Sequence, residues 1–236
     1  MTDTFGRTMR DTLEGKDAKY IIERDDGFIR HASAQPLVRP FEEWDEAEKD
    51  AIKNRQGPFL DVGCGVARVG DYVKSQGMEY YGIDLSPIAV EMCHKRGHEN
   101  VFVMSAENIT FDAGIFKTVV LYGNNFGIMG TPDGVVKMLK QLYRVTSRDA
   151  VILAGSLDPE ATHNEVHLAY HAKNRAQGLP PGKIKLRNKY QGEVDDWWYL
   201  LLCGLDLMSE IAKKAGWFIE KVFGGPQYHV GALRKS

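Results

Sequence analysis

The sequence predicts an α/β protein with a doubly wound, mostly parallel sheet of seven strands that ends in an antiparallel hairpin. From residue 58 onwards, short apolar runs alternate with amphipathic stretches, and glycine-containing turns separate them. Two strand-like segments joined by residues 224–226 (GGP) close the chain. Alternation of strand and helix favours parallel strands with right-handed crossovers, because a helix returns the chain to the same edge of the sheet.

Each element is predicted from its own local signals. Ser86 and Pro87 have the residue types of an N-cap and a first helical position, and Gly97 is expected to end that helix. Strands are expected at residues 59–62, 79–84, 101–104, 116–122, 150–154, 183–190, 217–222 and 228–233. Helices are expected at residues 66–73, 86–97, 133–145, 163–177 and 206–215.

The residues before the core contain a turn signal and an acidic helix. Residues 25–27 (DDG) predict a turn between two short apolar segments, and residues 42–53 are predicted to be helical. Tyr20, Phe41 and Trp44 make this arm too aromatic for a simple linker. These aromatics either pack the arm onto the core or form a wall over a ligand, and packing is the favoured alternative.

Length, charge and cysteine content limit the class of protein. The 236 residues carry a formal net charge of -2, so no overall basic field favours a nucleic-acid partner. Cys64, Cys93 and Cys203 show no pairing pattern, which favours a reducing, cytoplasmic location. We see no signal peptide and no apolar run of membrane-spanning length. The oligomeric state stays open.

Residues 58–70 (PFLDVGCGVARVG) form the central pattern of the chain. The apolar residues within 59–62 predict a strand buried on both faces, and glycines break it at once. Val66, Val69 and Val73 then recur at helical spacing, so the segment is predicted as strand, glycine turn and helix. Such a turn lets a ligand approach the backbone closely, in front of the free N–H groups of a helix N-terminus.

The next predicted strand ends in Asp84. This acid follows Gly63 by about the separation expected between a glycine turn and a ribose-binding carboxylate. An ionised carboxylate accepts two hydrogen bonds, which suits the two hydroxyls of a ribose. A dinucleotide-binding turn needs a third glycine at position 68, where this chain has Arg68. The sequence therefore predicts a nucleoside site and disfavours a nicotinamide or flavin cofactor.

Residues 61–65 (DVGCG), followed by residues 82–84 (GID), resemble the class I S-adenosylmethionine-dependent methyltransferases. Residues 105–108 (SAEN) resemble that family's loop beside the adenine, and the resemblance covers residues 58–155. It implies a Rossmann-like methyltransferase fold, S-adenosyl-L-methionine as cofactor and S-adenosyl-L-homocysteine as product. It also implies the cofactor-binding positions, which are Asp61, Gly63, Cys64, Gly65, Asp84, Leu85, Ala106, Glu107, Gly123 and Asn124.

The resemblance implies a single methyltransferase domain over residues 1–236. Many related enzymes cover the cofactor with an N-terminal helical segment, so residues 1–57 are expected to form an arm or lid. Residues 58–155 are expected to bind the cofactor. Residues 156–202 break the alternation of strand and helix and are expected to cap the substrate. Residues 203–236 supply the last helix and the hairpin.

The catalytic residues are less well defined, because methyl transfer mainly requires the acceptor to be held in line with the methyl group. Asn125 follows the fourth core strand, where class I enzymes place residues near the transferable methyl. His167, Tyr170 and His171 share one face of a predicted helix with His163 and Asn174. The side chains on that face are expected either to orient the substrate or act as a base, to make structural polar contacts, or to bind a metal. No Cys or carboxylate cluster completes a metal site, so none is predicted.

A predicted strand at residues 183–190 carries four basic residues on one face. A solvated face is the favoured interpretation, followed by a site for an acidic small molecule and then by RNA binding. The favoured function is a methyltransferase that acts on a small-molecule acceptor, with nucleic acid disfavoured as a partner and no membrane partner expected. The alternatives are an RNA or protein methyltransferase and a non-catalytic, methyltransferase-like protein that binds S-adenosylmethionine.

Overall fold

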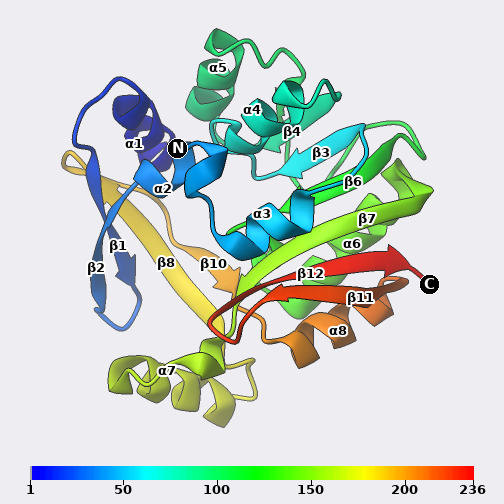
Figure 1. Ribbon diagram of the computed structural model, residues 1–236. Coiled ribbons are helices and arrows are strands. Elements are labelled where there is room, and N and C mark those ends of the chain that lie inside the picture. Colours follow the sequence, from blue (N-terminus) through cyan, green and yellow to red (C-terminus); the bar gives the residue numbers. More distant parts are fainter. Residues whose placement is uncertain (1) are drawn as a thin grey trace. The chain divides into compact units, whose positions relative to one another are not determined.

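The structure, a computed structural model, describes residues 2–236 (Figure 1). These residues divide into two compact units. Unit 1 comprises the residues up to Trp44 together with residues 57–106 and 185–198. Unit 2 comprises residues 45–56, 107–184 and 199–236. Three separate stretches of chain enter each unit, so each one depends on contacts between residues that are far apart in the sequence.

The larger sheet has seven strands in the order β11-β12-β7-β6-β3-β4-β5. β3, β4 and β5 are parallel, as are β6 and β7, whereas β12 is antiparallel to β7 and to β11. The predicted doubly wound sheet with an antiparallel terminal hairpin is therefore confirmed. Its strands are β3 (Phe59–Val62), β4 (Tyr80–Asp84), β5 (Val101–Val103), β6 (Phe116–Leu121), β7 (Thr146–Leu157), β11 (Trp217–Gly224) and β12 (Tyr228–Lys235).

A second sheet was not anticipated from the sequence. Its strand order is β10-β8-β1-β2, and β9 pairs with β8. β1 and β2 form a hairpin around the predicted turn, and β1 pairs antiparallel with β8, with Ile22 opposite Asn188. The N-terminal arm and the predicted insertion thus meet in one sheet. Its strands are β1 (Lys19–Arg24), β2 (Ile29–Ser33), β8 (Lys183–Tyr190), β9 (Glu193–Val194) and β10 (Trp198–Leu201).

The helices mostly begin at residues that cap them. Ser86, for example, accepts a hydrogen bond from the Ala89 N–H at 2.9 Å, as expected for an N-cap. In residues 2–236 no helix is both long and apolar enough to cross a membrane. The helices are α1 (Thr4–Leu13), α2 (Gln35–Val38), α3 (Glu46–Ile52), α4 (Arg68–Ser75), α5 (Pro87–Lys95), α6 (Pro132–Val145), α7 (Glu165–Ala176) and α8 (Leu205–Lys214), with short 3-10 helices η1 (Phe41–Glu43), η2 (Asn125–Gly127) and η3 (Pro159–Ala161).

The helix predicted over residues 42–53 is wrong at its start. Trp44 is extended, with φ of -67° and ψ of 162°, and α3 begins only at Glu46. Asp45 precedes it and accepts a hydrogen bond from the Ala47 N–H at 2.9 Å, which is the geometry of an N-cap. The sequence-based prediction extended this helix across its N-cap, Asp45, because acidic residues lie on both sides of that position.

Two other boundaries also differ from the prediction. α7 begins at Glu165 because Asn164 caps it, accepting a hydrogen bond from the Val166 N–H at 2.9 Å. His163 therefore precedes the helix and does not share the face that was predicted for it. β7 is longer than the predicted residues 150–154, because it pairs with β12 as far as its last residue.

In unit 2, α3 and α8 lie on opposite faces of β12. The Tyr228 hydroxyl donates a hydrogen bond to Glu48 of α3 at 2.8 Å. A Cβ atom at Gly231 would lie 2.9 Å from the Met208 sulfur of α8. Successive strand residues point to opposite faces, so residues 228 and 231 face different layers. α6 packs against α8 (Figure 1).

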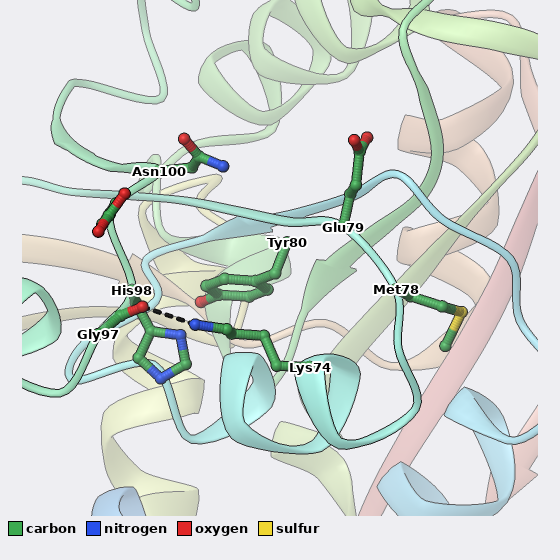
Figure 2. A pocket seen from close by; sticks show the side chains of 8 residues that line it. Lys74, Met78, Glu79, Tyr80, Gly97, His98 and Asn100 are labelled. Atoms are coloured by element: carbon green, nitrogen blue, oxygen red, sulfur yellow. Dashed lines mark hydrogen bonds between the residues drawn. The ribbon is translucent and has the colours of Figure 1, made fainter.

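In unit 1, α4 lies close against the start of β4 (Figure 2). A Cβ atom at Gly70 would lie 2.6 Å from the Tyr80 ring, so glycine permits this approach. The Tyr80 hydroxyl donates a hydrogen bond to Asp61 at 3.0 Å, and burial raises the pKa of Tyr80 well above its ordinary value. A cavity of about 320 Å³ opens beside Tyr80 and His98. It lies at the amino end of β4, the end opposite Asp84.

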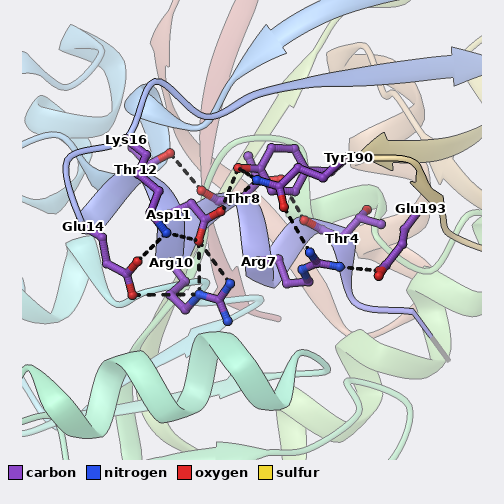
Figure 3. A network of polar contacts seen from close by, with 11 residues as sticks. Thr4, Arg7, Thr8, Arg10, Asp11, Thr12, Glu14, Lys16, Tyr190 and Glu193 are labelled. Carbon is purple, nitrogen blue, oxygen red and sulfur yellow. Dashed lines mark hydrogen bonds and ion pairs between the residues drawn. The ribbon is translucent and has the colours of Figure 1, made fainter.

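Polar contacts fasten α1 to the segment at the end of β8 (Figure 3). Asp11 is only 2% exposed and accepts hydrogen bonds from the Tyr190 hydroxyl at 2.8 Å and from Arg10 at 3.1 Å. At the start of the helix, the Thr4 hydroxyl donates to Asp195 at 2.6 Å. Both ends of α1 are therefore held by residues that follow it by more than 170 positions.

We expect Tyr190→Phe to lower the free energy of unfolding by about 1–2 kcal/mol, because Asp11 loses one buried donor while the ring packing is kept. Urea unfolding of the two proteins measures the difference. Lys19→Gln, which removes an exposed ion pair with Asp17, is the control and should change the free energy by less than about 0.5 kcal/mol.

The effect should depend on pH in one direction. Burial raises the pKa of Asp11, but hydrogen bonds from Tyr190, Arg10 and Lys16 outweigh it, and the net pKa lies below 3.8. A carboxyl group whose pKa is lower in the folded than in the unfolded protein stabilises the fold at pH values above its unfolded-state pKa. That stabilisation is lost as the pH falls through its folded-state pKa. The difference between the two proteins should therefore shrink below about pH 4. A difference that grows on acidification contradicts this assignment.

Candidate functional site

The turn between β3 and α4 uses backbone conformations that suit glycine. Gly63 has a φ of 71° and Gly65 a φ of 54°, both in the left-handed region. Ala67 adopts the same region with a φ of 62°, and α4 begins at the next residue, Arg68. A residue with a Cβ atom pays about 1–2 kcal/mol for this conformation. The predicted glycine turn at a helix N-terminus is thus present.

Asp84 connects this turn to the end of β4. Its carboxylate accepts the Gly65 N–H at 2.8 Å on one oxygen and the Ser86 N–H at 2.9 Å on the other. Burial raises the pKa of Asp84, the nearby Asp3 carboxylate adds to the rise, and the two N–H groups oppose it. The parallel register places Val62 opposite Ile83, so both strands end at the same level. The glycine turn and the acid therefore form one site.

Asp3 is a residue of this region that the sequence reasoning missed. One of its oxygens accepts the Gly6 N–H at 2.9 Å and caps α1. The other accepts the Ser86 hydroxyl at 2.6 Å at the start of α5. An Asp just before a helical pattern signals the first role, but the second depends on residues 83 positions apart.

α1 covers the glycine turn within unit 1. A Cβ atom at Gly65 would lie 3.1 Å from the Met9 sulfur. Met9 is buried in a small apolar cluster with Ala34, Val66 and Ala89. The lack of a side chain at Gly65 therefore serves both the left-handed turn and the close approach of α1.

Two buried cysteines lie beside the same turn. The thiols of Cys64 and Cys93 each donate to the Gly65 carbonyl, at 3.7 and 3.3 Å. A hydrogen bond with Cys93, followed by burial, raises the pKa of the Cys64 thiol well above its ordinary value. A thiol with a raised pKa is a poor nucleophile. Cys64 thus has the features of a packing residue whose backbone lines the turn.

The remaining predicted cofactor positions lie in both units. Leu85 follows Asp84 and is 69% exposed. Asp61 is buried and accepts the Tyr80 hydroxyl. Ala106 is the last residue of the segment 57–106 of unit 1, and Glu107 is the first residue of the segment 107–184 of unit 2. The backbone carbonyl of Glu107 accepts a hydrogen bond from the Gln141 side-chain amide.

In unit 2 the turn after β6 is held by two residues that the sequence analysis did not single out for this site. Gly123 has a φ of 66°, and its N–H donates to the Tyr228 hydroxyl at 3.0 Å and to Glu48 at 3.2 Å. The neighbouring Asn124 accepts the Leu157 N–H at 2.9 Å. Glu48 is 3% exposed, which is rare for a glutamate. No local signal marks this, because Glu48 and Tyr228 are 180 positions apart.

The predicted catalytic residues come from two elements of unit 2. Asn125 opens η2, directly after the Gly123 turn. Tyr170 and His171 are buried on α7. Asn174, on the same face, donates to the carbonyl groups of Pro181 at 2.9 Å and Lys183 at 2.7 Å, so part of this face is structural. His167, also on α7, is half-buried.

A glycine turn after a buried strand, an acid at the end of the next parallel strand and a doubly wound sheet are the features of a Rossmann-like α/β domain. Residues 59–149 match the family model described as "Methyltransferase domain". This match confirms the predicted resemblance to methyltransferases over residues 59–149, and the sheet order confirms the predicted Rossmann-like fold.

Solved structures share this fold over most of the chain. A SAM-dependent methyltransferase from Bacteroides fragilis, solved in complex with S-adenosyl-L-homocysteine, aligns with 99% of this chain and 95% of its own, with a TM-score of 0.84 and 21% identity. The CcbJ methyltransferase from Streptomyces caelestis aligns with 87% of this chain and 100% of its own, with a TM-score of 0.60 and 13% identity. Identities this low show a shared fold.

A curated relative matches part of the chain. YqeM of Bacillus subtilis (strain 168), named as a methyltransferase, is 22% identical over 118 residues. The match covers 48% of this chain and 47% of YqeM, so this chain spans about half the length of that relative.

We expect Gly65→Ala to lower the free energy of unfolding by more than the roughly 1–2 kcal/mol of left-handed strain, because the new methyl group also crowds Met9. Gly114→Ala is the matched control, since Gly114 has a φ of 76° with nothing within 4 Å of the added atom. Guanidinium unfolding of both variants gives the comparison. Equal losses in the two variants are incompatible with close packing of α1 on the turn.

Proposed function

We propose that this chain transfers a methyl group from S-adenosyl-L-methionine to a small-molecule acceptor and releases S-adenosyl-L-homocysteine. The observation that carries the proposal is the 2.8 Å hydrogen bond from the Gly65 N–H to the Asp84 carboxylate. It joins the glycine turn and the acid at the carboxyl ends of β3 and β4. Open α/β sheets bind their ligands at these ends.

The residues present fit the nucleoside part of this cofactor. Each Asp84 oxygen accepts one backbone hydrogen bond and keeps a lone pair for a ribose hydroxyl. The exposed Leu85 side chain offers apolar surface to the adenine. The glycines allow the ligand to approach the backbone. The other proposed contacts are Asp61, Gly63, Cys64, Ala106, Glu107, Gly123 and Asn124.

When bound, S-adenosyl-L-methionine supplies an electrophilic methyl group on a positively charged sulfur. The task of the protein is to hold the acceptor so that its lone pair is in line with the methyl carbon. A lone pair forms the new bond as the sulfur–carbon bond pair returns to sulfur. A general base is needed only where the acceptor must lose a proton.

The proposed acceptor-side residues are Asn125, His167, Tyr170 and His171. Asn125 is supported by its position after the Gly123 turn, and an amide side chain can orient an amine or a hydroxyl. The three residues on α7 are supported by their shared face. Each of them is proposed to orient the acceptor or to accept its proton.

The segments around the core are proposed to enclose the reaction. Residues 1–57 act as a lid, which is supported by the packing of α1 on the glycine turn. Residues 156–202 act as a cap that selects the acceptor. The net charge of -2 supports a small molecule over a nucleic acid. Three buried free cysteines support a reducing, cytoplasmic location.

We expect Asp84→Asn to weaken binding of S-adenosyl-L-methionine and of S-adenosyl-L-homocysteine by about 10- to 100-fold. A hydrogen bond to a charged group contributes about 1.5–3 kcal/mol, and 1.4 kcal/mol is tenfold in affinity. Calorimetric titration of the purified chain with each compound measures the change, and NAD titrated in parallel should not bind.

Asp149→Asn is the matched control, because Asp149 is an exposed carboxylate that accepts the Ser147 hydroxyl in unit 2. It should leave both affinities unchanged. Circular dichroism shows whether each variant is folded. Unchanged affinity in a folded Asp84→Asn variant, or binding of NAD alone, would overturn the proposal.

A further inference from the structure

A cavity of about 530 Å³ lies in unit 2 at the carboxyl end of β7. This volume is within the usual range for small-molecule sites. Residues from η3, the start of α8 and the β11–β12 turn line it. Its apolar walls include Leu202, Leu205, Val222 and Pro226. The cavity is large enough for a ligand with an apolar body.

The polar part of the lining is acidic. Asp158, Glu160 and Asp206 contribute carboxylates, and none of the described residues that line the cavity is Lys or Arg. Glu160 is paired with Arg175 outside the lining. Asp158 and Asp206 are left without a cationic side chain as partner among the described lining residues. Their negative potential favours a cation and disfavours an anion.

The backbone fixes the position of Asp158. Its carboxylate accepts the Glu160 N–H at 2.9 Å. A Cβ atom at Gly204 would lie 3.0 Å from both carboxylate oxygens, so glycine at this position leaves space for them. Gly204 is the N-cap residue of α8, and as a glycine it has no side chain to accept a capping hydrogen bond. A carboxylate beside this helix N-terminus is favourably placed.

His229 adds an acceptor to the lining. It is 1% exposed, and its Nε2 atom has no hydrogen-bond partner among the described residues. The imidazole also hydrogen-bonds the backbone of Cys203, and this bond is assigned to Nδ1 because Nε2 has no partner. Burial lowers the pKa of His229, with Asp158 opposing the shift, so the ring is neutral near pH 7. Nε2 then carries a lone pair and accepts a proton donor.

Two hydrogen bonds tie the cavity to the candidate site. The Leu157 N–H, one residue before Asp158, donates to Asn124 at 2.9 Å. The Asn174 amide of α7 donates to the carbonyl of Pro181, which lines the cavity. Residues in or next to the cavity wall are therefore hydrogen-bonded to the turn after β6 and to the helix that carries three of the proposed acceptor-side residues.

We infer that this cavity binds a small organic amine with an apolar body, held by Asp158, Asp206 and His229, and that the methyl acceptor belongs to this class. The second part rests on the proposed function. For methylation at nitrogen the ammonium first loses one proton, which passes to Nε2 of His229 or to one of the acceptor-side histidines proposed above, His167 and His171. The freed lone pair then bonds to the methyl carbon as the sulfur–carbon pair returns to sulfur.

Calorimetric titration of the full chain with three probes of one shape tests the ligand class. The probes are 2-phenylethylamine, 2-phenylethanol and 3-phenylpropionate. We expect saturable binding of the amine and at least tenfold weaker binding of the alcohol and the acid. Equal binding of the three probes, preference for the acid, or no saturable binding of the amine overturns the inference.

Variants locate the binding. Asp206→Asn and Asp158→Asn should each weaken amine binding at least fivefold, and Asn keeps the capping ability of residue 158. His229→Asn keeps a donor for Cys203, removes the Nε2 acceptor and should also weaken binding. Glu210→Gln is the matched control on α8, because Glu210 pairs with Lys214 and does not line the cavity. Amine binding that is unchanged in both aspartate variants places the amine elsewhere and overturns the inference.

S-adenosyl-L-methionine titrated on the same samples separates the two proposals. Amine binding without binding of the cofactor refutes the proposed methyl transfer and keeps the cavity as an amine site. Cofactor binding without amine binding refutes the amine site and keeps the proposed function. Mass spectrometry of the amine after incubation with the cofactor should show a gain of one methyl group.

Discussion

The candidate site depends on one carboxylate that connects the ends of two parallel strands. β3 and β4 end at the same level, and each continues into a turn that presents a backbone N–H group to the Asp84 carboxylate. Asp84 accepts one such group from each turn, through Gly65 and Ser86. This arrangement holds the glycine turn open towards a ligand while leaving acceptor capacity on both oxygens. The neighbouring Asp3, α1 and α5 are arranged around the same carboxylate.

Two further carboxylates, on or next to α1, attach the N-terminal segment to the rest of unit 1. Asp3 links the start of α1 to α5, and Asp11 links its other half to Tyr190. Asp11 is buried and Asp3 is half-buried. A carboxylate that leaves water is tolerated only where donors replace it, and both residues have such donors. A lid attached in this way opens by breaking charge-assisted hydrogen bonds rather than by separating apolar surfaces alone. Opening of the proposed lid is therefore an electrostatic event as well as a packing event.

Local patterns in the sequence were sufficient to predict most of the larger sheet and the part of the candidate site that lies in unit 1. The run from Phe59 to Arg68 carries its strand, its turn and the start of its helix in adjacent residues, and Asp84 follows at a fixed spacing. Pairings between distant segments left no such signal. The pairing of β1 with β8 and the contact of Glu48 with Tyr228 join residues more than 160 positions apart. From the sequence alone, Glu48 is expected to be a surface residue of an acidic helix. In the structure it is buried, and Tyr228 and Gly123 donate hydrogen bonds to it.

In the two proposed sites, the surroundings of Asp84 and Asp158 would give the same side chain different ligand preferences. Asp84 has a backbone donor on each oxygen, so its remaining lone pairs suit neutral hydroxyl groups. Asp158 shares its cavity with Asp206 and His229, and none of the described residues that line it is Lys or Arg. A ligand without N–H donors would leave these groups dehydrated and unpaired, which costs more than the loss of an apolar contact. Discrimination at this cavity should therefore arise mainly from rejection of neutral and anionic analogues, whereas its apolar walls distinguish ligand size only weakly.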